Sequence, residues 1–217
     1  MKKHVIAGSL ITALLLTLIV PAKANNDKYQ EAMKKNILAV YQAESIEQLQ
    51  QAVNAFVRIG DAEKTKWEPY YYTAFGYVMM ATREVEGSKK DEHLDQAMKA
   101  VDKAKSIAPE ESEIIAMEGF VHMIRLTVDP ASRGQQFSGL AMRSFAKAVE
   151  LNPENPRALA LMARMQFGTA QFFGSSTAEA CATAARAQEK METYQSENPL
   201  APTWGKKMIE EMRGQCQ

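Results

Sequence analysis

Residues 144–165 read SFAKAVELNPENPRALALMARM and contain two apolar helical stretches separated by a short turn rich in Asn and Pro. Asn155 followed by Pro156 predicts a helix start, because an Asn side chain can cap the first free amides and Pro suits the first helical position. Turns that contain a proline also follow the helical stretches ending before Pro109 and Pro199. The chain is therefore expected to stop and restart its helices at regular intervals.

The rest of the sequence is rich in Ala, Glu, Lys, Gln and Met, which are good helix formers. No stretch shows the strict alternation of apolar and polar residues that is typical of a half-buried strand. The expected fold class is therefore all-α. Helices are expected near residues 27–43, 45–60, 69–85, 91–107, 111–127, 138–151, 156–169, 177–197 and 202–215.

The helices that precede three prolines carry side chains of matched size at matched distances from the proline. These positions are Ala97, Val101 and Ala104 before Pro109, then Ala141, Phe145 and Ala148 before Pro153, then Ala187, Met191 and Tyr194 before Pro199. Small residues let two helices approach closely, and a larger residue fills the space between them. The pattern indicates a repeated helical hairpin.

This pattern resembles the tetratricopeptide repeat (TPR), a helix–turn–helix unit that stacks into a superhelix. The matched positions are Gly76, Ala97, Ala104 and Pro109; then Gly119, Ala141, Phe145, Ala148 and Pro153; then Ala163, Ala187 and Pro199. The resemblance covers Trp67 to Pro199, and a degenerate unit with Val40, Ala52 and Phe56 extends it toward the N-terminus. It implies a right-handed α-solenoid of about four TPR-like helix pairs with a C-terminal capping helix.

The three prolines are 44 and 46 residues apart, whereas a TPR unit has a period of about 34 residues. We expect the surplus in a lengthened first helix and a lengthened following loop in each unit, with the loops at residues 84–91, 127–138 and 168–177 emerging on one edge of the stack. HEAT-type arrays have periods of about 40–47 residues and rank second, because the spacing before each proline follows the TPR pattern. Two short patterns, at 132–140 and 199–205, resemble exported, largely uncharacterised bacterial TPR proteins and assign no activity.

The N-terminus predicts export. Lys2 and Lys3 precede a short apolar run and a small-x-small exit at residues 21–24, which is typical of a cleaved signal peptide. The expected domains are a signal peptide, residues 1–24, and a single helical domain, residues 25–217, in the periplasm or outside the cell. An uncleaved N-terminal anchor is the alternative, and after cleavage no stable membrane anchor is expected.

Net charge argues against a nucleic-acid partner. The 26 Lys and Arg residues fall to 23 when the three signal-peptide lysines are removed, against 26 Asp and Glu. A slightly acidic protein lacks the basic surface that attracts nucleic acid or an anionic membrane.

Catalytic patterns are weak. Glu118 and His122 share a helix face and could form a metal or acid–base pair, but a helix-surface contact is the commoner role of such a pair. Ser144 and Lys147 match the serine–lysine spacing of penicillin-recognising enzymes without that family's companion motifs. No catalytic residue, metal or cofactor is therefore expected, and the protein is predicted not to be an enzyme.

The TPR resemblance implies a protein-binding scaffold with a concave groove for a protein or peptide partner. The family's inward positions correspond here to Tyr70, Tyr77, Met80, Phe120 and Met123 as apolar contacts, with Arg157 and Arg164 for an acidic group. The alternative is a small-molecule or anion receptor, or an enzyme subunit, that uses the loop edge near Arg133 and residues 172–176. These aromatic and Met residues could also simply pack against neighbouring helices.

The only two cysteines, Cys181 and Cys216, are expected to form a disulfide. In an antiparallel helix hairpin that turns between residues 197 and 202, their axial levels agree within about 3 Å. Two unrelated thiols are the alternative. The terminal helix should also cap the last repeat, because Trp204, Met208 and Met212 recur on one helix face.

Overall fold

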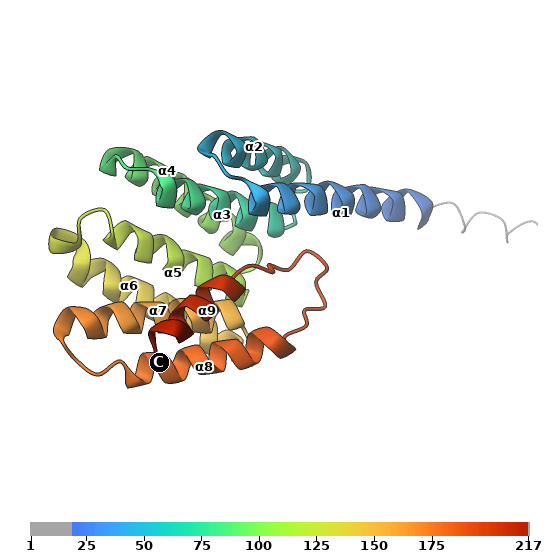
Figure 1. Cartoon of the computed structure of the whole chain (residues 1–217). Helices are drawn as coiled ribbons and strands as arrows, with labels where there is room; N and C mark the ends of the chain where they lie inside the picture. The colour runs from blue at the N-terminus through green and yellow to red at the C-terminus, as the bar shows by residue number, and fades with distance from the viewer. Residues whose placement is uncertain (1–18, 217) are drawn as a thin grey trace, which may run out of the picture.

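Nine α-helices make up the regular structure of residues 19–216, the part of the chain that the computed structural model describes (Figure 1). They are α1 (Ile19–Gln42), α2 (Ile46–Ala62), α3 (Glu68–Arg83), α4 (Gly87–Ile107), α5 (Ser112–Leu126), α6 (Pro130–Leu151), α7 (Pro156–Phe173), α8 (Ala178–Thr193) and α9 (Lys206–Gln215). The all-α prediction is confirmed. The predicted signal peptide, residues 1–24, lies mostly outside the described residues.

The helices pair as hairpins: α1 with α2, α3 with α4, α5 with α6, and α7 with α8. The first helices of successive hairpins also contact one another, so that α3, α5 and α7 form one continuous side of the stack, which we call the inner face. The connections within the hairpins lie on one edge of the stack, on the left in Figure 1. Within residues 19–216, no helix is both long and apolar enough to cross a bilayer.

The extra length of each unit lies in its helices and not in its loops, which corrects the prediction of lengthened loops. The loops within the hairpins span only 84–86, 127–129 and 174–177. The helix α6 starts at Pro130 because the Asp129 side chain accepts a hydrogen bond from the Ser132 amide and caps it. The Ser- and Gly-rich segment that follows is therefore helical, and its polar side chains are exposed or half-buried.

Glycines permit the closest helix contacts, as the repeat pattern predicted. A Cβ atom at Gly119 would lie 2.4 Å from the Phe145 ring, and a Cβ atom at Gly76 would lie 2.4 Å from the Val53 side chain. Both distances are too short for two carbon atoms. The glycines thus let a large partner side chain lie directly against the opposite helix backbone, and Phe145 is fully buried there.

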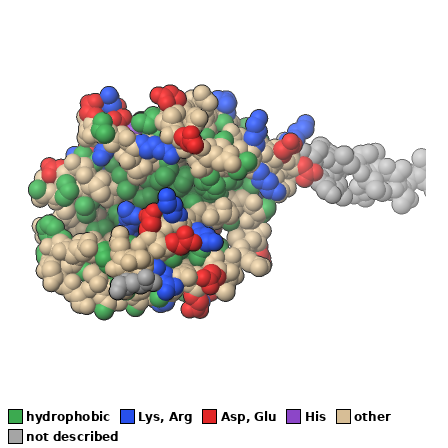
Figure 2. Space-filling model, in the orientation of Figure 1, with side chains coloured by type: hydrophobic (Ala, Val, Ile, Leu, Met, Phe, Trp, Pro, Cys, Tyr) green, Lys and Arg blue, Asp and Glu red, His purple; other side chains and the backbone are tan. Residues whose placement is uncertain are grey.

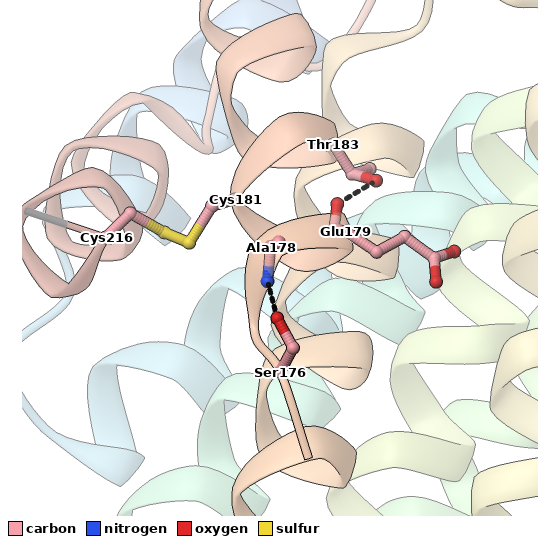
Figure 3. Close-up of a disulfide and its surroundings, with 6 residues drawn as sticks. All are labelled: Ser176, Ala178, Glu179, Cys181, Thr183 and Cys216. Carbon is pink, nitrogen blue, oxygen red and sulfur yellow. Dashed lines mark hydrogen bonds between the residues drawn. A yellow bond between two sulfur atoms is a disulfide. The ribbon is translucent and has the colours of Figure 1, made fainter.

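The C-terminal helix covers the last hairpin. Ile209 and Met212 of α9 are buried against α7 and α8. The predicted disulfide between Cys181 and Cys216 is confirmed, with Cα atoms 5.6 Å apart, and it joins α8 to the end of α9 (Figure 3). Trp204, which was expected on the same helix face, lies before α9, because the helix begins only after Gly205, whose φ is +114°.

Candidate binding site on the inner face

Four aromatic side chains from four different segments meet on the inner face. Tyr41 comes from α1, Phe75 from α3, Phe120 from α5, and Trp204 from the segment before α9. Successive ring centroids, in the order Tyr41, Phe75, Trp204 and Phe120, are 5.6, 5.4 and 5.7 Å apart. We call these four residues the aromatic face. Such a surface favours flat apolar groups, because aromatic rings at these separations attract one another.

The members of the aromatic face differ in exposure. Phe75 and Phe120 are only 5% and 7% exposed, whereas Tyr41 and Trp204 are half-buried. The Trp204 indole Nε1 donates a hydrogen bond to the Tyr71 hydroxyl at 3.0 Å, so the polar edge of the indole is satisfied inside the protein. A molecule that arrives from solvent would therefore meet Trp204 and Tyr41 first.

Apolar side chains extend this surface toward the loop edge. Met79 and Ile124 are half-buried and follow Phe75 and Phe120 by four residues, so they lie on the same helix faces one turn further on. In Figure 2, hydrophobic side chains gather in a band across the middle of the molecule, above the charged side chains at the position of α9. The inner face thus carries an apolar surface that the chain itself covers only in part.

A non-helical segment, residues 194–205, brings Trp204 to this surface, and we call it the C-terminal strap (Figure 1). Its hydrogen bonds to the first helices run from Asn198 Nδ2 to Glu68 Oε1 at 3.1 Å, from Tyr72 Oη to the Leu200 carbonyl oxygen at 2.8 Å, and from the Thr203 amide to Tyr41 Oη at 3.2 Å. Leu200 is buried in the main core. The strap therefore occupies part of the groove that was expected to be open.

The residues predicted to line the groove do not form one site. Phe120 belongs to the aromatic face, and Met123, three residues on, is 7% exposed. Tyr70 points instead toward α2, where its hydroxyl donates to the Gly60 carbonyl oxygen at 2.8 Å. The Tyr77 ring stacks on the His93 ring of α4, with the ring centroids 6.3 Å apart.

Met80 is fully buried, so its side chain serves the packing of the hairpin. A periodic pattern places a side chain on a helix, but it does not decide which of two neighbouring helices the side chain faces.

Arg157 differs most from expectation. The residue is 1% exposed, and its Nε donates to both carboxylate oxygens of Glu113 at 2.9 Å. Burial opposes a charge on Arg157, but the Glu113 carboxylate outweighs that effect and raises the pKa of the guanidinium. Arg157 is therefore engaged within the fold and does not present its charge to a partner. Arg164, two turns further along the same side of α7, is exposed.

The alternative site at the loop edge is also internally paired. Arg133 donates two hydrogen bonds to the Asp91 carboxylate, at 2.7 and 2.8 Å, and this contact lowers the pKa of Asp91. Phe172 and Phe173, by contrast, are 80% and 74% exposed, with ring centroids 5.0 Å apart. The arginine expected to hold an anion thus already holds a carboxylate of its own chain.

Glu118 and His122 make their direct contacts with other residues. Glu118 accepts from Lys105 Nζ at 2.9 and 3.0 Å, while the His122 ring lies against Phe137 with centroids 6.0 Å apart. His122 lines an open hollow of about 400 Å³ between α4, α5 and α6. Within residues 19–216, no group of three or more His, Cys, Asp or Glu side chains is arranged to hold a metal ion.

The stacked hairpins, the glycine contacts between their helices and the aromatic face together define a TPR-like helical scaffold. Neither a protein-family model nor a curated protein matches the sequence. Among solved structures, the HusA haemophore from Porphyromonas gingivalis is similar with a TM-score of 0.78 and 27% identity, covering 87% of this chain and 92% of HusA. A thermophilic TPR protein from Thermus thermophilus, TTC0263, is similar with a TM-score of 0.54 and 16% identity, covering 79% of this chain and 87% of that protein. This second likeness concerns the fold alone.

Proposed function

We propose that this protein is an exported scaffold that binds haem, or a related flat tetrapyrrole, on its aromatic face. The observation that carries the proposal is the structural similarity to a haemophore over nearly the whole length of both chains. The scaffold holds its ligand and performs no chemistry on it, so the protein is not proposed to be an enzyme.

The chemistry of the inner face suits such a ligand. A tetrapyrrole is a broad, flat, apolar ring, and haem also carries two carboxylates at one edge. Trp204 and Tyr41 offer aromatic surface for the ring, and Met79 and Ile124 extend that surface. Exposed cations are available for the carboxylates, namely Arg164 on α7 and Lys206 and Lys207 at the start of α9.

Export is part of the proposal. A disulfide persists in the periplasm or outside the cell, where reducing systems do not keep thiols reduced. The predicted signal peptide, residues 1–24, would direct the chain there. Sequencing the N-terminus of the protein recovered from the cell envelope or medium tests this point, and Asn25 is the expected first residue.

Titration of the purified protein with haemin tests ligand binding. We expect a saturable change in the haemin absorbance at one haemin per chain, with a Kd of about 1 µM or tighter. Iron-free protoporphyrin IX should bind within about tenfold of haemin, because the proposed contacts are to the ring and its carboxylates. If neither porphyrin binds saturably, the proposed function is wrong.

A matched control locates the site. Phe172 and Phe173 form the most exposed aromatic pair of the described residues, and they end α7, which runs out to the loop edge in Figure 1. Replacing both with Ala should leave the haemin affinity unchanged. If this variant loses binding, the ligand belongs to the loop edge.

A protein or peptide partner is the second candidate, and the exposed Arg164 beside the inner face is the observation that favours it. An Arg164→Glu variant should then recover less partner in a pull-down while melting at the same temperature. Arg157 is not a suitable probe for this purpose, because its substitution would leave Glu113 buried without a counter-charge.

A further inference from the structure

The ligand surface is completed by a part of the chain that does not belong to the repeats. Three members of the aromatic face come from the first helices of the hairpins, but Trp204 arrives on the C-terminal strap. Within residues 19–216, no backbone–backbone hydrogen bond joins the strap to α1, α3 or α5. The position of Trp204 is therefore set by side-chain contacts and by what holds the two ends of the strap.

The indole stacks on the Phe120 ring and is tilted against the Phe75 ring. Its plane is inclined by 27° to the Phe120 ring and by 32° to the Phe75 ring. These two ring contacts cover part of Trp204, and the side chain as a whole remains half-buried. Since Phe75 and Phe120 are almost inaccessible, the indole is the aromatic surface that a flat ligand can reach on this side.

The far end of the strap is held by α9. This helix has 10 residues, which is too short to be stable in isolation, and it directly follows Trp204 and Gly205. Ile209 and Met212 anchor it by burial, and the disulfide closes a 35-residue loop that contains the strap. The disulfide thereby restricts how far α9, and with it Trp204, can move from the inner face.

We propose that Trp204 is a ligand-contacting residue of the tetrapyrrole site and that the Cys181–Cys216 disulfide holds it in the binding position. This inference rests on the proposed function and adds a redox dependence to it. Reduction by a dithiol would transfer two electrons and two protons to the disulfide, giving two thiols and an oxidised dithiol. The freed α9 would loosen Trp204, and the ligand would bind more weakly.

Substitution of the two tryptophans tests the contact. Trp204→Ala should weaken haemin binding about tenfold or more, and Trp204→Phe should retain most of the affinity, because a smaller ring still stacks. Trp67→Ala is the matched control: Trp67 is also half-buried and lies against Tyr71, but it is not part of the aromatic face. Equal haemin affinity in Trp204→Ala and the wild-type chain would overturn the inference.

A measurement on the wild-type chain avoids any effect of substitution on folding. The chain has two tryptophans, so its NMR spectrum should contain two indole N–H signals, which a Trp67→Phe variant assigns. Diamagnetic gallium protoporphyrin IX should shift the Trp204 signal strongly through its ring current and leave the Trp67 signal nearly unchanged. A Trp204 signal that does not move while the porphyrin binds would contradict the contact.

The redox part is tested with a Cys181→Ser/Cys216→Ser variant and, separately, with dithiothreitol on the wild-type chain. Both should reduce haemin affinity at least about threefold, while circular dichroism shows that the repeats stay helical. Dithiothreitol should not affect the variant. Unchanged affinity in both arms would overturn the redox dependence. Failure of the wild-type chain to bind either porphyrin would overturn the proposed function itself, and this inference with it.

Discussion

Each of the two edges of the helical stack pairs an arginine with a carboxylate, but the two pairs differ in burial. At the edge where successive hairpins join, Arg157 and Glu113 form an ion pair whose side chains are 2% and 5% exposed. At the opposite edge, where each hairpin turns, Arg133 and Asp91 form a comparable pair with side chains 29% and 26% exposed. Water reaches the Arg133–Asp91 pair but not the Arg157–Glu113 pair. The two pairs therefore contribute differently to the free energy of unfolding.

The joining edge is built from equivalent positions of the repeat. Glu68, Glu113 and Arg157 lie in the first turns of α3, α5 and α7, 45 and 44 residues apart. One repeat offers a carboxylate where the next offers a guanidinium, and Tyr29 donates to Glu68 at the N-terminal end. The joining edge therefore links neighbouring repeats through buried polar contacts, whereas the loop edge depends on half-buried ones.

Breaking the buried pair should have the largest effect. Arg157→Met would leave the Glu113 carboxylate buried and unpaired, and we expect a loss of about 3–5 kcal/mol in the free energy of unfolding, measured with urea. Replacing both residues, as Arg157→Met/Glu113→Leu, should restore most of that loss because no isolated charge remains. A single variant as stable as the double variant would contradict this account of the joining edge.

Removing the disulfide should have the next largest effect, since it is the strongest single contact near the loop edge. Closure of its 35-residue loop is expected to contribute about 3–4 kcal/mol in the chain-entropy account. The Cys181→Ser/Cys216→Ser variant should therefore unfold at a lower urea concentration than the wild-type chain. If the two midpoints coincide, the buried contacts of Ile209 and Met212 suffice to hold α9.

Arg133→Met tests the half-buried pair directly and should lower the free energy of unfolding by at most about 1 kcal/mol. The arginine lowers the pKa of Asp91, so the small contribution of this pair is present at neutral pH and is lost as the pH falls through the carboxylate range. Urea unfolding at pH 7 beside Arg157→Met provides the comparison. Equal losses in the two variants would remove the distinction between the two edges.

The smallest expected effect concerns His122, which lies between the two edges on α5. Burial lowers the pKa of His122 below its ordinary value of 6.5, so the unfolded chain binds this proton more readily than the folded one. Its contribution to stability is full above about pH 6.5 and is lost as the pH falls below that through the lowered pKa of the folded state. A His122→Gln variant should show a flatter dependence of stability on pH over this range, measured by urea unfolding at half-unit steps.

The sequence was sufficient for the features that repeat or that have a single solution. Proline, glycine and alanine spacing predicted the hairpins, because close packing at Gly76 and Gly119 leaves no alternative residue size. Two cysteines in a predicted helix hairpin allowed one pairing, and the structure has that pairing.

The candidate site was less predictable. The burial of Arg157 depends on Glu113, 44 residues earlier in the chain, and the matching repeat positions are the signal that could have revealed this pair. The return of Trp204 to the inner face carries no such signal. Pro199 and Pro202 indicate that a helix ends, but they do not determine the direction in which a non-helical segment leaves.

The C-terminal strap also changes the topology of the array. A solenoid is ordinarily an open row in which each unit touches only its neighbours, so it can lengthen by duplication and can unravel from an end. Here the Thr203 amide reaches the Tyr41 hydroxyl across 162 residues of chain, which ties the last unit to the first. A closed array of this kind offers no free end on which an added C-terminal unit could stack. Its repeats should unfold together in one cooperative transition.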